Sequence, residues 1–325
     1  MIGDVKRFEK YLPKLDVVNR FQVRVVDRGT PDAQIMQEVC DADVIVADAI
    51  SPVSETLMQA LPSLKLVQSE GVAYNAIDVE AARERGIFVC NNAGVNAGSV
   101  AEQAVLLMLA CLRSAVAGDA AVREGRQIQM KERLMVEGIR ELGDCKVGLV
   151  GMGAIAVQTV KRLQPFGCSM AYWNRTRRPV EVEDELGIEY LELDELARSC
   201  DIVSLHVPVT PETTNLVDEA FLSKMKSDAV LINTARGEIV DQVALANALE
   251  RGSIGAAGMD TLSPEPVAVD HPLVQLSAPA SQKVVFSPHI GGVTEGMFRR
   301  AWTAIWQNAE RIEKGERPFN IVNGL

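Results

Sequence analysis

Three polar side chains in the last third of the sequence have the chemistry of an acid–base site that holds an anion. Arg236 follows Asn-Thr-Ala, Glu265 lies between two prolines, and His289 precedes Ile-Gly-Gly. An arginine can bind a carboxylate through two parallel hydrogen bonds and fix its orientation, which a lysine cannot do. A histidine can give or take a proton near neutral pH. Each residue alone also has an ordinary structural explanation, so the elements that position the three have to be found.

A glycine-rich turn is the clearest of these elements. Residues 151–156, GMGAIA, follow the apolar run VGLV and open a helical pattern. In that context Gly151 permits a tight turn, Gly153 lets the backbone approach a pyrophosphate, and Ala156 lets the helix pack on the strand. The helix N-terminus then offers free N–H groups to the phosphates of a dinucleotide. The predicted contacts are those of Gly151, Met152, Gly153, Ala154 and Ile155.

The residue after the next strand discriminates between the two nicotinamide dinucleotides. An acidic residue there would bind the ribose hydroxyls of NAD and repel the 2′-phosphate of NADP. This chain has Asn174, followed by Arg175, Thr176, Arg177 and Arg178. Three guanidinium groups without an acid suit a 2′-phosphate, while Arg177 and Arg178 also fit solvated surface charges. We therefore favour NADP over NAD as the cofactor, with contacts from Asn174, Arg175 and Thr176.

Around these motifs the chain alternates short apolar runs with helical patterns, which predicts parallel sheets with helices on their faces. In the first series the predicted strands are residues 21–27, 43–48, 64–71 and 87–90, and the helices are 31–40, 54–62 and 78–86. In the second series the predicted strands are residues 146–151, 169–174, 201–208, 229–237, 255–260 and 283–289. The helices of this series are residues 154–165, 193–199, 218–226, 241–251 and 294–314.

The segment between the two series begins with a helix that is apolar on nearly every face. Ser99 and Glu102 have the spacing of a capping box, in which each side chain bonds a free backbone N–H at the helix start. A helix without a polar face is buried. We expect this one to lie between domains or in a subunit interface.

Bulk composition excludes several classes of protein. The 325 residues are 47% hydrophobic and 24% charged, which is typical of a globular protein with room for two domains. The formal net charge of −11 argues against nucleic acid or an anionic membrane as partner. No apolar run reaches the ~20 residues that span a bilayer, and the N-terminus lacks a secretory pattern, so we expect a cytoplasmic protein. The six cysteines form no CxxC pair, so neither a disulfide framework nor a metal site is expected.

Four blocks of the sequence resemble the D-isomer-specific 2-hydroxyacid dehydrogenase family, in the family's order. They are VGLVGMGAIA with WN at 173–174, LARSCDIVSLHVPVTPETTNLV at 196–217, MKSDAVLINTARGEIVD at 225–241, and GMDTLSPEP followed by SPHIGG. The resemblance implies an α/β fold of two Rossmann-like domains with parallel sheets. A dinucleotide-binding domain, residues 98–289, would be inserted into a discontinuous, flavodoxin-like catalytic domain of residues 1–97 and 290–325.

The resemblance also implies roles for the three polar side chains. Arg236 would clamp the carboxylate of a 2-oxo acid. His289 would be the general acid, giving a proton to the carbonyl oxygen while C4 of the nicotinamide delivers a hydride to the carbon. Glu265 would hydrogen-bond the other imidazole nitrogen and favour the charged ring. The implied activity is the reversible reduction of a small 2-oxo acid to the D-2-hydroxy acid by NADPH or NADH.

Further positions follow from the same resemblance. Those that match substrate-binding positions are Val72 and Ala73, through their backbone N–H groups, and Asn96. Those that match cofactor-binding positions are His206, Val207, Pro208, Thr213, Thr234, Ala235, Arg236, Asp260, His289 and Gly291. Asp260 would lie near the nicotinamide carboxamide. His271 has no such match and is interpreted as a structural histidine in a loop.

Three departures from the family pattern leave the substrate open. Asn75 stands where many relatives have aspartate, Gln103 stands where many have histidine, and residues 123–142 lack the usual tryptophan. A glyoxylate or hydroxypyruvate reductase is the favoured interpretation. A phosphoglycerate dehydrogenase would need a cationic phosphate pocket that the sequence does not locate, and formate dehydrogenases carry glutamine in place of Glu265.

Two expectations concern partners rather than the substrate. The family dimerises through its dinucleotide domains, so a homodimer is expected. The alternative from another class is a transcriptional corepressor, which shares the fold and uses the cofactor as a ligand. Such proteins usually carry extra terminal segments for their partners.

Overall fold

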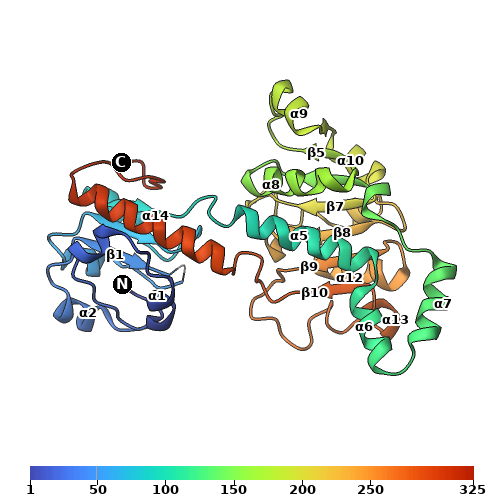
Figure 1. The fold of residues 1–325 in the computed structure, drawn as a ribbon, viewed down its shortest axis with the longest axis horizontal. Coiled ribbons are helices and arrows are strands. Elements are labelled where there is room, and N and C mark those ends of the chain that lie inside the picture. Colours follow the sequence, from blue (N-terminus) through green and yellow to red (C-terminus); the bar gives the residue numbers. More distant parts are fainter. Residues whose placement is uncertain (49) are drawn as a thin grey trace. The chain divides into compact units, whose positions relative to one another are not determined.

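The chain folds into two compact units in a computed structural model that describes residues 1–48 and 50–325. Unit 1 comprises Met1–Asn96 and Val293–Leu325, and unit 2 comprises Ala97–Gly292 (Figure 1). Unit 1 is therefore built from both ends of the chain, and unit 2 is one continuous segment. The boundaries expected from the sequence were 97/98 and 289/290.

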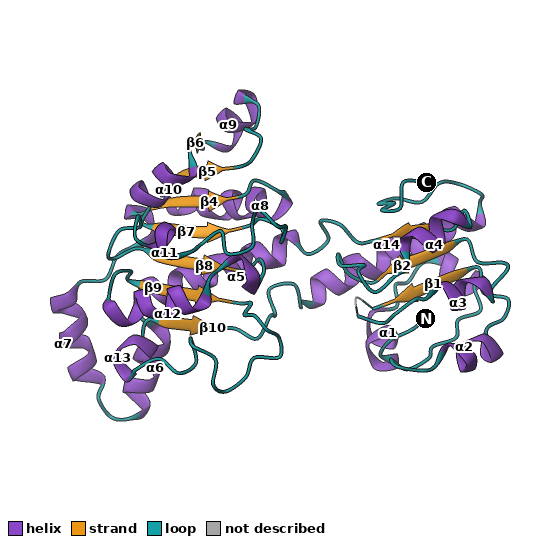
Figure 2. Ribbon diagram, turned by 180° about the vertical axis from the view of Figure 1, so that it is seen from behind, coloured by secondary structure: helices purple, strands orange, loops and turns teal. Residues whose placement is uncertain are grey.

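Unit 2 is built on a seven-stranded parallel sheet. Its strands are β4 (Lys146–Val150), β5 (Ser169–Trp173), β6 (Glu189–Tyr190), β7 (Ile202–Leu205), β8 (Val230–Asn233), β9 (Ala256–Met259) and β10 (Val284–Phe286). They lie in the order β10-β9-β8-β7-β4-β5-β6 (Figure 2). The order reverses between β4 and β7, and α/β sheets bind ligands at such a point, outside the carboxyl ends of the strands. The predicted α/β class with parallel sheets is confirmed.

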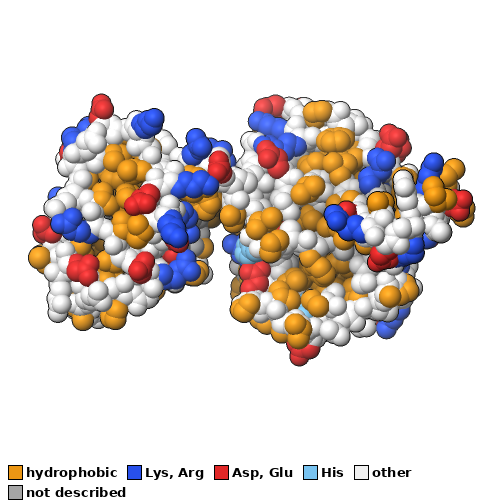
Figure 3. All heavy atoms as spheres, turned by 60° about the horizontal axis from the view of Figure 1, so that its bottom comes forward, with side chains coloured by type: hydrophobic (Ala, Val, Ile, Leu, Met, Phe, Trp, Pro, Cys, Tyr) orange, Lys and Arg blue, Asp and Glu red, His pale blue; other side chains and the backbone are white. Residues whose placement is uncertain are grey.

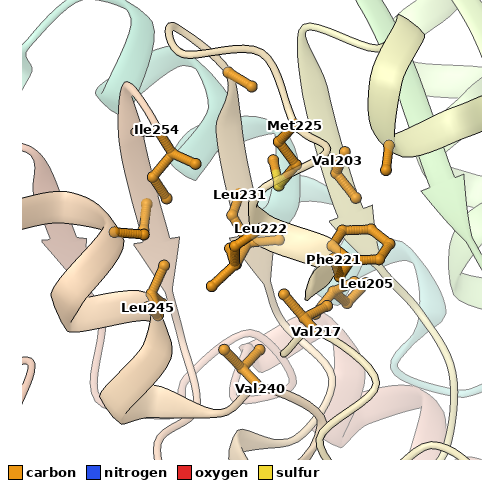
Figure 4. Packing of buried hydrophobic residues seen from close by; sticks show 14 of the residues in the cluster. Val203, Leu205, Val217, Phe221, Leu222, Met225, Leu231, Val240, Leu245 and Ile254 are labelled. Atoms are coloured by element: carbon orange, nitrogen blue, oxygen red, sulfur yellow. The ribbon is translucent and has the colours of Figure 1, made fainter. Parts of the chain in front are cut away.

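Side chains that alternate along these strands build a hydrophobic core on each face of the sheet. The helices of unit 2 are α5 (Ala97–Leu112), α6 (Ala115–Arg123), α7 (Gln127–Glu137), α8 (Ala154–Leu163), α9 (Val180–Leu186), α10 (Leu193–Ser199), α11 (Glu219–Leu222), α12 (Gln242–Arg251) and α13 (Ala278–Ser281). Val203 and Leu231 pack with residues of α11 and α12 (Figure 4). Their chain neighbours Ile202 and Val230 pack with residues of α5 and α8 on the opposite face. Strands covered on both faces are rigid supports for the loops at their ends.

The apolar helix α5 differs from its prediction at its first turn. It begins at Ala97, so Ser99 lies within its first turn, and the carboxylate of Glu102 pairs with Arg162 of α8 at 3.0 Å. The predicted capping box is therefore wrong, because the helix already begins at Ala97, two residues before Ser99. The burial of α5 comes from its own unit, where it packs against α8 and the strands β8 and β9.

No single helix in the described residues is long and apolar enough to cross a membrane. The helices α5 and α6 together have the length and apolar composition of a membrane span, but they are bent by 58° relative to each other.

Unit 1 contains a smaller parallel sheet whose strands, in spatial order, are β1 (Val44–Ala47), β2 (Leu66–Ser69) and β3 (Phe88–Cys90). Its helices are α1 (Val5–Tyr11), α2 (Asp32–Glu38), α3 (Glu55–Gln59), α4 (Val79–Glu84) and α14 (Glu295–Glu313). The buried side chains of α14, including Trp302 and Trp306, form a core cluster with Val17 and Val46.

The segment 21–27 was predicted as a strand, and the structure contradicts this. Only Val26 joins a ladder, through an isolated bridge to Ile2. Phe21 and Val23 instead pack against the α14 cluster. The alternating apolar residues of this segment contact a helix. Periodicity alone cannot distinguish such a segment from a strand inside a sheet.

Candidate functional site

The three predicted catalytic side chains lie beyond the ends of three adjacent strands of unit 2. Arg236 follows β8, Glu265 follows β9, and His289 follows β10. Because the strands are parallel, their carboxyl ends lie at the same edge of the sheet. The loops after β8 and β9 also touch, since a Cβ on Gly237 would overlap the backbone of Leu262.

His289 and Glu265 form a hydrogen-bonded pair. The distance from Nδ1 of His289 to Oε2 of Glu265 is 2.7 Å. An ionised carboxylate only accepts hydrogen bonds, so Nδ1 carries the hydrogen and Nε2 is left for another partner. The side chains are 41% and 40% exposed, so a small molecule can reach the ring. Leu262 donates its backbone N–H to the other oxygen of Glu265 at 3.4 Å.

Asp260 holds the backbone on both sides of His289. His289 has a φ of 55° and donates its own N–H to the carbonyl oxygen of Asp260 at 2.8 Å. The carboxylate of Asp260 accepts the N–H groups of Ile290 at 3.1 Å and Gly291 at 2.9 Å. It also accepts the hydroxyl of Ser287 at 2.5 Å. This role in fixing the histidine loop was not part of the sequence-based prediction for Asp260.

Arg236 is exposed, and the turn that carries it is fixed by a buried asparagine. Asn233 donates its amide to the carbonyl oxygen of Arg236 at 2.8 Å and accepts the N–H of Ala235 at 3.0 Å. The guanidinium itself bonds the carbonyl oxygen of Ala235 at 2.7 Å. Asn233 was not among the residues predicted from the sequence, although a polar residue at the end of an apolar strand was a signal that could have identified it.

The glycine turn has the backbone geometry that its sequence predicts. Gly151 has a φ of 99°, and a Cβ there would lie 2.9 Å from the carbonyl carbon of His206. Gly153 is the N-cap of α8 without a side-chain cap, and a Cβ there would meet open space. The N–H of Met152 is donated to Oδ1 of Asn174 at 3.1 Å. The turn leaves a helix N-terminus, a glycine and open space where the phosphates of a dinucleotide would lie.

The three arginines after β5 do not form the cluster that the sequence suggested. Arg177 pairs with Glu183 at 2.8 Å and lies over the ring of Tyr190. Arg178 donates to the carbonyl oxygen of Met152 at 2.5 Å. Arg175 is exposed and makes no hydrogen bond or ion pair within the described residues. Arg177 and Arg178 are therefore structural, neither free for a phosphate nor merely solvated, because each has a polar partner from its own unit.

Two residues that directly follow a strand of unit 2 each have a buried side-chain atom with no partner within the described part of the chain. These atoms are Nδ1 of His206, after β7, and Oγ1 of Thr234, after β8. Nε2 of His206 bonds the hydroxyl of Ser204 at 3.0 Å, and burial lowers the pKa of the ring to about 4. Buried polar groups are normally satisfied. Both atoms are among the predicted cofactor contacts, and the pair fits a site completed by a polar ligand.

Other predicted contacts have structural partners. The hydroxyl of Thr213 bonds the carbonyl oxygen of Pro208 at 2.6 Å, which closes the loop after β7. Val207 is buried and Ala235 is half-buried. His271 is buried and accepts the N–H of Leu273 at 3.2 Å, in accord with a structural role.

The predicted substrate loop belongs to unit 1. Ser69 donates its hydroxyl to the carbonyl oxygen of Ala73 at 2.6 Å, and Asn91 donates its amide to that of Val72 at 2.8 Å. The N–H groups of Val72 and Ala73 make no hydrogen bond within the described residues. Asn96 is the last residue of the first segment of this unit. The loop therefore has two N–H groups available as donors. Ser69 and Asn91, which were not predicted from the sequence, hold its carbonyl oxygens.

Comparison with known proteins agrees with this geometry. The family model "D-isomer specific 2-hydroxyacid dehydrogenase, NAD binding domain" matches residues 105–291. A glyoxylate reductase of Korarchaeum cryptofilum is 37% identical over 91% of this chain and 88% of its own length. A D-3-phosphoglycerate dehydrogenase of Methanocaldococcus jannaschii is 33% identical over 92% of this chain and 55% of its own length. The D-lactate dehydrogenase of Aquifex aeolicus, solved with NAD and lactic acid, is 26% identical with a TM-score of 0.79 and covers 99% of this chain and 97% of its own.

The family match includes the glycine turn, both strand ends with unpartnered polar atoms, and the loop of His289. The resemblance inferred from the sequence is confirmed, as is a nicotinamide dinucleotide as cofactor. The chain therefore belongs to the D-isomer specific 2-hydroxyacid dehydrogenase family, and it is an oxidoreductase that transfers a hydride between a nicotinamide dinucleotide and a small 2-oxo or 2-hydroxy acid.

Proposed function

We propose that this enzyme reduces glyoxylate, hydroxypyruvate or a related small 2-oxo acid, with His289 as the proton donor. The observation that carries the proposal is the bond between Nδ1 of His289 and Glu265, which leaves Nε2 of an accessible ring without a partner among the described residues. A ring held in this way can donate a proton in a fixed direction. Positioned proton transfer of this kind contributes roughly 10²–10⁴-fold to a rate.

In the proposed mechanism each side chain acts on a defined atom of the substrate. The reduced nicotinamide, when bound, supplies the hydride that is added to the carbonyl carbon. Nε2 of His289 gives its proton to the carbonyl oxygen as the hydroxyl forms. Glu265 keeps the imidazole in one tautomer and stabilises the positive charge that the ring carries before transfer.

Arg236 binds and orients the substrate carboxylate in the same proposal. Its exposed guanidinium extends from a turn whose backbone Asn233 fixes, so the point from which the side chain reaches the substrate is set. The free N–H groups of Val72 and Ala73 are the further donors proposed for the carboxylate. Reaction in a fixed orientation lowers the entropic part of the barrier.

For the cofactor, we propose a preference for NADPH over NADH. Position 174 carries asparagine instead of the acidic residue that would repel a 2′-phosphate. Nδ2 of Asn174 donates to the carbonyl oxygen of Thr176 at 2.8 Å. Of the three arginines, only Arg175 still supports the preference, since Arg177 and Arg178 are engaged elsewhere. A single guanidinium can still form a charge-assisted pair with a phosphate.

A substrate panel tests the function. Purified protein is mixed with NADH or NADPH and with glyoxylate, hydroxypyruvate, pyruvate or branched 2-oxo acids, and cofactor oxidation is followed at 340 nm. We expect turnover of at least one acid with k_cat/K_M highest for glyoxylate or hydroxypyruvate. If neither NADH nor NADPH is oxidised with any acid of the panel, the proposal is refuted.

Phosphoglycerate oxidation is the second candidate, because the Methanocaldococcus relative is 33% identical over 92% of this chain. It is tested by adding 3-phosphohydroxypyruvate to the same panel. A k_cat/K_M for this compound above that for glyoxylate and hydroxypyruvate would replace the first proposal with the second.

We also propose a homodimer formed through unit 2. The support is a set of exposed apolar side chains on α6 and α7, of which Met135 is 74% and Val136 is 89% exposed. Figure 3 shows hydrophobic side chains gathered at several places on one face of this unit. Exposed apolar patches of this kind mark contact surfaces. Light scattering after gel filtration is expected to give twice the mass of 35.3 kDa, and a Met135→Glu, Val136→Asp variant is expected to give the monomer.

A cytoplasmic location is likewise proposed. The six cysteines, all among the described residues, are free, and four of them are buried. Free thiols are typical of a reducing compartment.

A further inference from the structure

A chain of hydrogen bonds connects the buried helix α5 to the loop that carries His289. Gln103 of α5 donates from Nε2 to the hydroxyl oxygen of Ser287 at 2.8 Å. Ser287 donates its one hydroxyl proton to Oδ1 of Asp260 at 2.5 Å. The carboxylate of Asp260 then accepts the N–H groups of Ile290 and Gly291, on the far side of the histidine.

The direction of this chain of bonds is determined by its donors. A serine hydroxyl has one proton, and an ionised carboxylate can only accept. The proton of Ser287 therefore points to Asp260, and its oxygen is free to accept from the amide of Gln103. With the amide of Gln103 turned the other way, its oxygen would compete with Asp260 for that proton. Gln103 thus ensures that the buried carboxylate keeps its third donor.

The helix α5, Asp260 and the loop of His289 are also closely packed against one another. Asp260 is 3% exposed, so a lost donor is not replaced by bulk water. A Cβ on Gly291 would lie 2.9 Å from Oδ2 of Asp260 and 3.4 Å from Cβ of Gln103. The helix α5 therefore touches the loop directly as well as through Ser287.

His289 depends on this arrangement because its backbone is in a region that side chains other than glycine rarely occupy. Its φ is 55°, and such a conformation persists only when the surroundings hold it. Asp260 supplies three of the holding contacts, one through its carbonyl oxygen to His289 and two through its carboxylate to the next two residues. The N–H of His289 also bonds the carbonyl oxygen of Ser287 at 3.0 Å. The backbone that carries the imidazole is thus held by Asp260, whose own carboxylate is held by Ser287 and Gln103.

We propose that Gln103 and Ser287 are positioning residues that fix the direction of the His289 imidazole by acting through Asp260. Neither residue touches the proton that is transferred. The catalytic consequence rests on the function proposed above, whereas the structural consequence for the His289 ring does not.

Kinetics of four variants test the catalytic consequence. Ser287→Ala is expected to lower k_cat roughly tenfold to a hundredfold, because a misdirected donor loses catalysis steeply, while substrate K_M and cofactor K_d stay within about threefold. Ser287→Thr retains a hydroxyl and is expected to keep most of k_cat. Gln103→Leu is expected to lower k_cat less than Ser287→Ala. The matched control is Ser281→Ala, since Ser281 is exposed and its hydroxyl, among the described residues, bonds only the carbonyl oxygen of Ala278.

A double variant shows whether the two residues act in one chain. Once Ser287 is alanine, the amide of Gln103 has lost its acceptor, so Gln103→Leu should add no further loss of k_cat. Losses that multiply in the double variant would overturn the proposal. A k_cat for Ser287→Ala within twofold of the unsubstituted enzyme would overturn it as well.

Nuclear magnetic resonance of the imidazoles separates this proposal from the proposed function. The chain has three histidines, and the spectrum of a His289→Ala variant assigns the His289 signal in histidine-labelled protein. In Ser287→Ala the His289 signal is expected to shift or broaden, while those of His206 and His271 stay unchanged. An unchanged His289 signal refutes the positioning role whether or not the enzyme turns over 2-oxo acids. A changed signal in a protein without turnover supports the positioning role and refutes only the function.

Discussion

The glycine turn at residues 151–156 and the loop of His289 both follow a strand of the same parallel sheet, but they are held in different ways. The turn is held by backbone conformation, since Gly151 adopts a φ of 99° and Gly153 caps α8 without a side chain. The loop is held by Asp260 and Gln103, whose side chains come from other segments of the chain, through Ser287 in the loop itself. A local conformation can be inferred from neighbouring residues, whereas a hydrogen-bond network depends on segments that only the fold brings together.

The largest expected effect comes from removing the group that the loop presents. His289→Ala is expected to lower k_cat roughly 10²–10⁴-fold, because the positioned proton donor is lost. Cofactor affinity, measured by nucleotide fluorescence, should stay within about threefold, since the glycine turn is untouched. Retention of more than a tenth of k_cat would show that another group gives the proton.

Next in size is a pH effect at His206, whose carbonyl group contacts Gly151. Burial lowers the pKa of His206 to about 4, whereas an unfolded histidine has a pKa of about 6.5. Between these values the unfolded chain binds more protons, so the free energy of unfolding falls as pH is lowered from 6.5 to 4. The contribution is about 3 kcal/mol at most. Urea unfolding at pH 7.5 and 4.5 is expected to show a smaller loss for His206→Asn than for the unsubstituted protein, and equal losses would contradict the assignment.

The two glycines of the turn allow a matched pair of substitutions. Gly151→Ala is expected to lower the free energy of unfolding by about 1–3 kcal/mol, because an alanine is strained at that φ and its Cβ meets His206. Gly153→Ala adds a Cβ in open space and should change stability by less than about 0.5 kcal/mol. It should nevertheless weaken cofactor binding about tenfold, equal to 1.4 kcal/mol. Native cofactor affinity in Gly153→Ala would show that the phosphates lie elsewhere.

The smallest expected effect is on the choice of cofactor. Arg175→Gln is expected to lower the preference for NADPH over NADH by about tenfold, the worth of one charge-assisted contact. Arg177→Gln is the control, because Arg177 is paired with Glu183 and should leave the preference unchanged. The ratio of k_cat/K_M for the two cofactors measures both. The proposed preference would be contradicted if Arg175→Gln and the unsubstituted enzyme gave the same ratio. It would also be contradicted if the unsubstituted enzyme clearly preferred NADH.

Where the sequence-based predictions were wrong, the missing information was tertiary. Residues 21–27 have strand periodicity, yet Phe21 and Val23 pack against α14, far away in the chain. Ser99 and Glu102 have capping spacing, yet Glu102 pairs with Arg162. Three arginines after β5 suggested one phosphate cluster, although the partner of Arg177 is Glu183 on α9. Each prediction rested on spacing, and spacing does not identify a partner.

The amino-acid sequence was sufficient to predict the alternating strands and helices, the glycine turn, the family and the three polar side chains after β8, β9 and β10. These follow from local conformation, periodicity and motif order, which neighbouring residues carry. The resemblance to the family already implied a bond between Glu265 and the His289 ring, and the structure identifies the bonded nitrogen as Nδ1. The bond from Arg178 to the carbonyl oxygen of Met152, and the bonds by which Gln103 and Ser287 hold Asp260, could be found only in the tertiary structure. A hydrogen bond needs two atoms within about 3 Å. For partners such as Gln103 and Ser287, only the packing of α5 on the sheet brings those atoms together.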